Sequence, residues 1–445
     1  MTSQSKFRFG PSEARCAPHG GAHLASQIPN AALYHITLAT LSRKPLKTNA
    51  WLSLQLRYNV RAHASDMRHS TSILPNTESG NVTPSTELDV KKFLKSIELA
   101  DIGRTIGDVG RVLNVTSADG KIDAQIELGF PAESRHDEFR SCIAAAISAE
   151  MEISDVNIEF TTKIVAHGVQ RNLKPLDGVR NVIAIASGKG GVGKSTVAVN
   201  IALALAADGA AVGLLDADIY GPSQPQMLGL GGKQPESDDG QSMHPLEAYG
   251  IQVMSIGFLV DADQPMIWRG PMVTSALNQL LLQTKWRDLD YLIVDMPPGT
   301  GDIQLTLSQQ VPVSGAVIVT TPQDIATLDA RKGLAMFRKV SVPVLGIIEN
   351  MSTHVCSHCG HEESIFGIGG GEQMASDFDV ELLGQLPLDA KIREQTDSGN
   401  PTVATDPDSA AAVAYRLAAE RLSATQAKQG RDYSSKFPKI VIEDG

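Results

Sequence analysis

The architecture is set by the stretch Ser187-Gly188-Lys189-Gly190-Gly191-Val192-Gly193-Lys194-Ser195-Thr196. From residue 188 to 195 it fits the phosphate-binding pattern G-x-x-x-x-G-K-[ST]. An apolar run at 182–186 precedes it, and another at 195–207 follows it, as expected of a buried strand and of a helix packed on a sheet. Together the three parts predict an α/β fold of the P-loop type, a mostly parallel sheet flanked by helices. A glycine-rich loop from another kind of enzyme is the weaker alternative, because it would not need all three parts.

The residue types in this loop suit a nucleotide. Glycines let backbone N–H groups turn toward an anion, and the following helix N-terminus favours negative charge. Lys194 is expected to neutralise the β- and γ-phosphates of ATP, and Ser195 or Thr196 to reach a Mg²⁺ ion. The predicted nucleotide contacts in the loop are Gly188, Lys189, Gly190, Gly191, Val192, Gly193, Lys194, Ser195 and Thr196.

Acidic residues follow two further apolar runs. The run at 210–215 leads into Asp216 and Asp218, and the run at 291–294 ends at Asp295. Strand ends of an open α/β sheet border its ligand crevice, so the first pair is expected to face the nucleotide. A simpler alternative is that this pair only caps its loop. The position of Asp295 matches the acid that holds Mg²⁺ in P-loop enzymes. In the loop after it, Gly299 is a candidate N–H donor to the γ-phosphate.

Cys356 and Cys359 form the second informative pattern, because two thiols at this spacing can bind one metal centre. Four ligands are needed, and a second copy of the chain would supply the other two. Four thiolates suit zinc or a 4Fe-4S cluster. Zinc held within one chain, with His354, His358 or His361, stays an alternative, and so does a thioredoxin-like redox pair.

Lys189 directly after the first glycine gives the form GKGGVGKS, which resembles the deviant Walker A group of ATPases. Two further tracts resemble one branch of it, the Mrp/ApbC-type iron–sulfur cluster carriers. These are the run DMPPGTGD at 295–302 and the run NMS at 350–352 followed by CxxCGH. The resemblance covers roughly residues 179–425.

The resemblance implies a homodimer in which Lys189 reaches the partner's nucleotide. It further implies catalytic roles for Lys194, Asp218 and Asp302, with Asp216 near the Mg²⁺ shell and base contacts from Asn350 and the loop at Pro387. The cysteine pairs of two chains would bridge a transferable 4Fe-4S cluster. Scaffold proteins and apo iron–sulfur proteins are the expected partners, and ATP hydrolysis the expected activity.

Three other functions would account for part of this pattern. A chromosome- or septum-positioning ATPase would use the same fold but would not need the cysteines. A zinc-binding P-loop ATPase would keep the fold and the cysteines without a cluster. A redox protein of the nitrogenase-reductase kind would place its cluster cysteines far apart. The net charge of -11 argues against a nucleic-acid surface. No run approaches the ~20 apolar residues of a membrane span.

Composition changes along the 445 residues. Up to residue 70 there are nine basic residues and two acidic ones, so 1–84 is expected to be an unfolded leader, either an organelle transit peptide or sequence upstream of a later start. Residues 85–165 predict a small α+β domain whose position resembles that of MIP18-like domains, although the Asp-Pro-Glu signature is absent. A linker at 166–178, the nucleotide domain at 179–425 and a tail at 426–445 complete the chain. Four cysteines suit a reducing compartment, so the expected location is the cytoplasm, or the mitochondrial matrix if the leader is a transit peptide.

Overall fold

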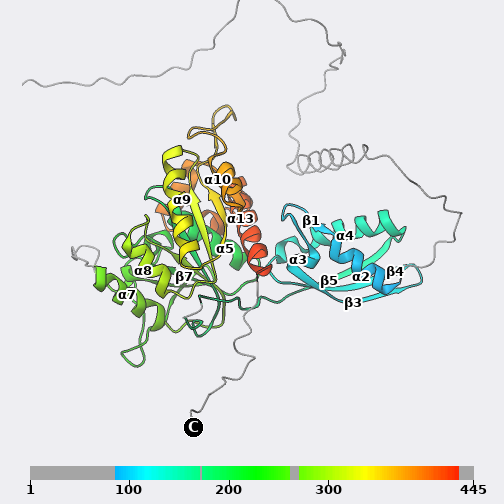
Figure 1. The fold of residues 1–445 in the computed structure, drawn as a ribbon, viewed down its shortest axis with the longest axis horizontal. Coiled ribbons are helices and arrows are strands. Elements are labelled where there is room, and N and C mark those ends of the chain that lie inside the picture. Colours follow the sequence, from blue (N-terminus) through cyan, green and yellow to red (C-terminus); the bar gives the residue numbers. More distant parts are fainter. Residues whose placement is uncertain (1–85, 171–172, 261–269, 430–445) are drawn as a thin grey trace, which may run out of the picture. The chain divides into compact units, whose positions relative to one another are not determined.

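The computed structural model describes residues 86–170, 173–260 and 270–429 (Figure 1). The predicted leader at 1–84 and nearly all of the predicted tail lie outside these residues. Within the described part, two bodies of secondary structure follow each other along the chain, a small one over 87–162 and a large one over 179–427.

The small body is the α+β unit expected from the sequence. Strands β3, β4 and β5 form a three-stranded sheet in which β3 and β4 are antiparallel and β4 and β5 parallel. The turn between β3 and β4 falls at Asp119 and Gly120, both with positive φ, as suits a tight hairpin turn. Phe130 and Phe139 are buried in its core. Its elements are α2 Glu87–Ser96, β1 Glu98–Leu99, β2 Arg104–Thr105, α3 Ile106–Val109, β3 Gly110–Ala118, β4 Lys121–Leu128, a 3₁₀ turn Glu133–Arg135, α4 His136–Met151 and β5 Asp155–Thr162.

The large body is an eight-stranded sheet in the order β15-β12-β11-β6-β10-β7-β9-β8. Every neighbouring pair is parallel except β8 and β9. The mostly parallel sheet predicted from the sequence is therefore confirmed. Its strands are β6 Val179–Ser187, β7 Val212–Asp216, β8 Leu246–Ala248, β9 Ile251–Ser255, β10 Leu289–Asp295, β11 Gly315–Thr320, β12 Val344–Glu349 and β15 Glu381–Gln385.

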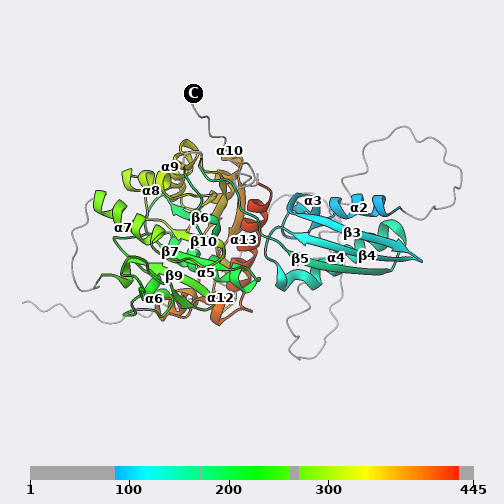
Figure 2. The ribbon, with the colours of Figure 1, turned by 90° about the horizontal axis from the view of Figure 1, so that it is seen from below.

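Helices cover both faces of this sheet. Helices α7, α8 and α9 lie on one face, and α5 and α13 on the other (Figures 1 and 2). Central strands are buried on both faces for this reason, which explains why they are continuous apolar runs rather than alternating ones. The helices are α5 Lys194–Ala207, α6 Gln224–Met227, α7 Gly270–Leu282, α8 Asp302–Gln310, α9 Asp324–Lys339, α10 Gly370–Phe378, α11 Ala390–Asp397, α12 Thr402–Thr405 and α13 Ala410–Ala427.

A short hairpin stands apart from the large sheet. Its strands β13 His354–Val355 and β14 Glu362–Glu363 pair antiparallel, and the cysteine pair lies between them. None of the described helices is long and apolar enough to cross a bilayer.

The first glycine of the phosphate-binding stretch is fixed by packing. A Cβ at residue 188 would overlap the backbone carbonyl of Asp329 in α9, whereas a Cβ at residue 190 would come no closer than 4.0 Å to its nearest neighbour, Pro298. Helix α9 therefore touches the backbone of the loop directly.

We expect Gly188→Ala to lower the free energy of unfolding by about 1–3 kcal/mol, because the clash is with backbone and only a shift of α9 relieves it. Gly190→Ala is the matched control in the same loop and should change it by no more than about 0.5 kcal/mol. Urea unfolding of the full chain followed by circular dichroism measures both. Equal effects of the two substitutions would contradict this packing argument.

Candidate functional site

Five neighbouring strands direct polar residues to one edge of the sheet. Strands β12, β11, β6, β10 and β7 are adjacent and parallel, so their carboxyl ends meet at the same edge. The phosphate-binding stretch follows β6, and an acid ends each of β7 and β10. This edge is the ligand crevice expected for an open α/β sheet.

The stretch after β6 surrounds a cavity of about 220 Å³. Gly191 and Gly193 have φ values of +85° and +80°, a region that side chains rarely adopt, so the turn depends on glycine there. Lys194 then begins α5, whose N-terminal N–H groups favour an anion. The cavity is lined by Ser187, Lys189, Gly190, Gly191, Gly193, Lys194, Ser195, Thr196, Asp218, Ser223, Met227 and Pro298.

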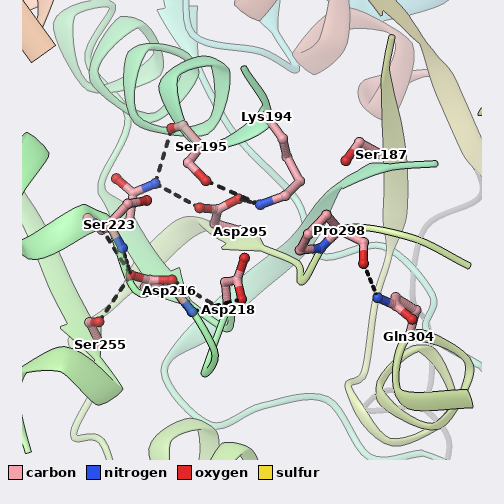
Figure 3. Close-up of polar contacts among 12 residues, drawn as sticks. Ser187, Lys194, Ser195, Asp216, Asp218, Ser223, Ser255, Asp295, Pro298 and Gln304 are labelled. Carbon is pink, nitrogen blue, oxygen red and sulfur yellow. Dashed lines mark hydrogen bonds and ion pairs between the residues drawn. The ribbon is translucent and has the colours of Figure 1, made fainter. Parts of the chain in front are cut away.

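Lys194 and Asp295 form a buried ion pair at the floor of this site (Figure 3). Their residues are 6% and 0% exposed, so neither charge would be stable there without the other. The lysine Nζ donates to Oδ1 of Asp295 and also to the Ser195 hydroxyl at 3.2 Å. The structure thus brings together the lysine, the serine and the acid that the sequence assigns to phosphate and Mg²⁺.

Asp216 and Asp218 occupy different environments although they lie two positions apart. Asp216 is fully buried and accepts from the Ser255 hydroxyl at 3.1 Å and from the N–H groups of Ser223 and Gln224 at 3.0 and 3.1 Å. Burial, with the nearby charge of Asp295, raises the pKa of Asp216 to about 7. Asp218 is half-buried and lines the cavity, and burial raises its pKa as well. Asp216 organises its loop, whereas Asp218 faces the ligand space.

Gln224 is a site residue that the sequence reasoning missed. Its side chain is buried, and Nε2 donates to Oδ2 of Asp295 at 2.9 Å and to the Ser195 carbonyl at 3.1 Å. Both carboxylate oxygens of Asp295 thereby have protein donors. No local motif marks such a role for an isolated glutamine.

The loop after β10 is held by backbone carbonyls. The Gly299 N–H, predicted to donate to the γ-phosphate, donates here to the Ser187 carbonyl at 3.0 Å. The Gln304 Nε2 donates to the Pro298 carbonyl (Figure 3). Asp302 begins α8, but its side chain lies outside the described residues. To donate to a phosphate, the Gly299 N–H would therefore have to leave the Ser187 carbonyl.

Of the two predicted base contacts, Asn350 lies next to the phosphate-binding stretch, and Pro387 lies next to the segment that leads into the cysteine hairpin. Asn350 is 5% exposed, and its Nδ2 donates to the Val192 carbonyl at 2.9 Å. Pro387 is half-buried in the segment after β15, whose neighbour Leu388 donates its N–H to the Thr353 carbonyl at 2.7 Å. Contact of either residue with a base stays a prediction.

The cysteine hairpin has the geometry of a half-built metal site. The Cys356 N–H donates to the His361 carbonyl at 2.9 Å, and Gly360, with φ +71°, donates to the Cys356 carbonyl at 2.8 Å. Backbone N–H groups of Cys359 and His358 directed at the Cys356 sulfur lower the pKa of that thiol. Cys359 is exposed and Cys356 partly so.

Neither histidine nor acid completes this site within the described part of one chain. Among residues 86–170, 173–260 and 270–429, no group of three His, Cys, Asp or Glu side chains is placed to hold one metal ion. The Nδ1 of His354, one of the alternative zinc ligands, donates to the Leu388 carbonyl at 2.9 Å. Two thiolates per chain is the arrangement that the geometry offers.

A larger hollow of about 730 Å³ lies away from both sites. Its described lining consists of Gln170, Leu173, Leu305, Gln309, Lys339, Val340 and Ser341. No carboxylate, thiol or imidazole is among them, so this hollow does not compete with the crevice as a site of nucleotide chemistry.

The comparisons with known proteins agree with this combination of crevice and hairpin. A family model described as NUBPL iron-transfer P-loop NTPase, of the ParA group, matches residues 178–423. An iron-sulfur cluster carrier protein of Haemophilus influenzae is 47% identical over 352 residues, which are 79% of this chain and 95% of that protein. The iron-sulfur cluster transfer protein NUBPL of Mus musculus is 56% identical over 256 residues, 57% of this chain and 80% of that protein.

Among solved structures, a nucleotide-binding protein from Archaeoglobus fulgidus in complex with ADP is 36% identical, with a TM-score of 0.47, over 52% of this chain and 90% of that one. The matched model spans more than half of the chain, and it begins one residue before β6 and ends within α13. The resemblance to the Mrp/ApbC-type carriers is thereby confirmed, and the chain belongs to the NUBPL iron-transfer P-loop NTPases.

Proposed function

We propose that this protein is an ATP-dependent carrier that accepts a 4Fe-4S cluster between two copies of the chain and delivers it to apo iron–sulfur proteins. The observation that carries the proposal is the presence, in one domain, of a phosphate-binding crevice and an exposed two-thiol hairpin. The names of the relatives as iron–sulfur cluster carriers support the same conclusion.

The crevice supports hydrolysis of ATP. Lys194 is placed to leave Asp295 for the β- and γ-phosphates, and Asp218 faces the same cavity from the opposite loop. In the proposed reaction Asp218 orients a water molecule and accepts its proton as the water oxygen bonds to the γ-phosphorus. The bond from that phosphorus to the bridging oxygen breaks, and ADP leaves with the electron pair. Burial raises the pKa of Asp218, which strengthens it as a proton acceptor.

The residues present fit a magnesium ion. Mg²⁺ prefers oxygen ligands, and the Ser195 hydroxyl and the Asp295 carboxylate converge on the Lys194 ammonium, which marks where positive charge is stabilised. Ser195 and Asp295 would hold the ion. When bound, the ion would supply positive charge that neutralises the charge developing on the phosphate.

The hairpin supports a shared cargo site. Each chain offers two thiolates, and a tetrahedral sulfur site needs four, so a second copy completes it. The lowered pKa of Cys356 favours the thiolate form that binds iron. Lys189 supports the same dimer through its position directly after the first glycine, since in the resembling ATPases the corresponding lysine reaches the partner's nucleotide.

For nucleotide chemistry we expect Lys194→Ala and Lys189→Ala to fail differently. Lys194→Ala removes the cation that meets the phosphates and should reduce both binding and hydrolysis, the latter by roughly 10²-fold or more. Lys189→Ala should leave nucleotide binding by the monomer nearly unchanged but abolish hydrolysis that depends on the dimer. Fluorescent nucleotide titration measures binding, phosphate release measures hydrolysis, and light scattering measures dimer formation. Unchanged hydrolysis in Lys189→Ala would refute the proposed contact across the dimer.

For cluster binding we expect anaerobic reconstitution to give about four irons and four sulfides per dimer, with loss of both in Cys356→Ala/Cys359→Ala. The matched control is Cys16→Ala/Cys142→Ala, which removes the other two thiols of the chain. Iron, sulfide and zinc analysis with absorbance spectroscopy is the measurement. Tight zinc without iron, or full cluster in the hairpin variant, would overturn the carrier proposal.

A further inference from the structure

The hairpin that carries the cysteines stands on a short stem of residues 351–354. The Ser352 N–H and hydroxyl both donate to the Leu386 carbonyl, at 2.9 and 3.0 Å. Leu388 donates its N–H to Thr353, and His354 donates Nδ1 to Leu388, at 2.7 and 2.9 Å. The stem is therefore fastened along the segment 386–388, so displacement of its base would be transmitted to Cys356 rather than absorbed by a slack loop.

The base of this stem is Asn350, which touches the phosphate-binding stretch. Its Nδ2 donates to the Val192 carbonyl at 2.9 Å, and its N–H donates to the Thr320 carbonyl at 2.8 Å. A Cβ at Gly193 would overlap the Asn350 amide, so the two segments are in direct van der Waals contact. Because the Asn350 side chain is nearly fully buried, movement of the Val192 carbonyl either carries Asn350 with it or leaves a buried donor unpaired.

The backbone of Met351, the first residue of the stem, is strained. Met351 has φ +58°, in the left-handed region that is unfavourable for a residue with a side chain. Such conformations persist only where the surroundings impose them, here through the bonds of Asn350 on one side and of Ser352 on the other. A backbone held in this way can adopt a second conformation when one of the two neighbouring residues moves.

We propose that Asn350 is a positioning residue that transmits occupancy of the phosphate-binding stretch to the Cys356–Cys359 pair through the stem 351–354. This inference rests on the proposed function, because it names how nucleotide controls the cargo site. The path is short, since Cys356 follows Asn350 by six positions. The loop after β10 is the rival path, but the bonds of Gly299 and Gln304 run to Ser187 and Pro298 and not to the hairpin.

The test uses the cluster-free full chain, so that it is independent of cargo binding. N-ethylmaleimide modifies the thiols, and mass spectrometry gives separate rates for Cys356, Cys359 and the reference thiol Cys142, with and without saturating non-hydrolysable ATP analogue and Mg²⁺. In the protein without substitutions, nucleotide should change the modification rates of Cys356 and Cys359 by about fivefold or more. The modification rate of Cys142 should stay the same.

Two substitutions break the path in different ways. Asn350→Asp keeps the shape and the Oδ1 acceptor of the side chain but removes the donor to Val192. Met351→Gly keeps every side-chain bond of Asn350 but relieves the strain at φ +58°. Both should bring the ratio of rates close to one at nucleotide concentrations that saturate each variant, as measured by fluorescent nucleotide titration. If Asn350→Asp binds too weakly to saturate, Met351→Gly alone tests the path.

Asn200→Ala is the matched control. Asn200 is also a buried asparagine next to the nucleotide site, and its side chain bonds to the Thr196 carbonyl and the Val403 N–H at 2.9 and 3.0 Å, away from the stem. It should lose stability but keep the ratio. Light scattering establishes the dimer fraction, because closure of a dimer could shield the thiols, and rates are compared at equal dimer fraction.

Each outcome is informative. The proposed path would be overturned if the variants at positions 350 and 351 kept the ratio of modification rates seen without substitution. It would also be overturned if nucleotide had no effect on the protein without substitutions. Cluster reconstitution on the same proteins separates the two proposals. A protein that binds cluster without a nucleotide effect refutes only this path, and one that shows the nucleotide effect without binding cluster refutes only the carrier function.

Discussion

The buried ion pair between Lys194 and Asp295 is the constraint on which the site depends. Removing one partner of such a pair typically costs about 3–5 kcal/mol, because it leaves the other charge buried and alone. A ligand that draws Lys194 away must therefore bring replacement positive charge to Asp295. Polyphosphate accompanied by a divalent cation meets that condition, whereas a phosphate without a cation does not. Gln224 limits the freedom of Asp295 further by holding its second oxygen and the carbonyl of Ser195.

The parts that could be predicted from sequence are those whose signal is local. The buried strands of the large sheet lie where apolar runs occur in the sequence, as β11 and β12 do at 315–320 and 344–349. The P-loop and the acid at 295 also carry their meaning in adjacent residues. Gln224 does not, because its partner Asp295 is 71 positions away and its partner at Ser195 is a backbone carbonyl. Contacts of that kind depend on the fold already being formed.

Other details of the fold also have local physical causes. Helix α7 ends at Leu282, where the Thr284 hydroxyl bonds back to the Leu280 carbonyl and the Trp286 Nε1 donates to the Leu281 carbonyl. Side-chain bonds to the last carbonyls compete with continuation of a helix. Strand β8 was not predicted, since its three residues follow a polar stretch and pair only at the edge of the sheet. Gly299 illustrates a different limit, because a motif identifies a donor but not the acceptor it holds in a given conformation.

The contrast between the two sites gives the proposed carrier its logic. Asp216 and Asp295 are buried, where low dielectric strengthens their interactions, whereas Cys359 is exposed and Cys356 partly so. If all four ligands of the cargo site lay in one chain, separation of the dimer would leave all four bonds to the cluster intact. Dividing the ligands equally between two chains means that separation of the dimer removes half of them from the cluster at once. Release then requires only a change in how the two chains meet, and the stem of the hairpin directly follows Asn350, which bonds to the phosphate-binding stretch.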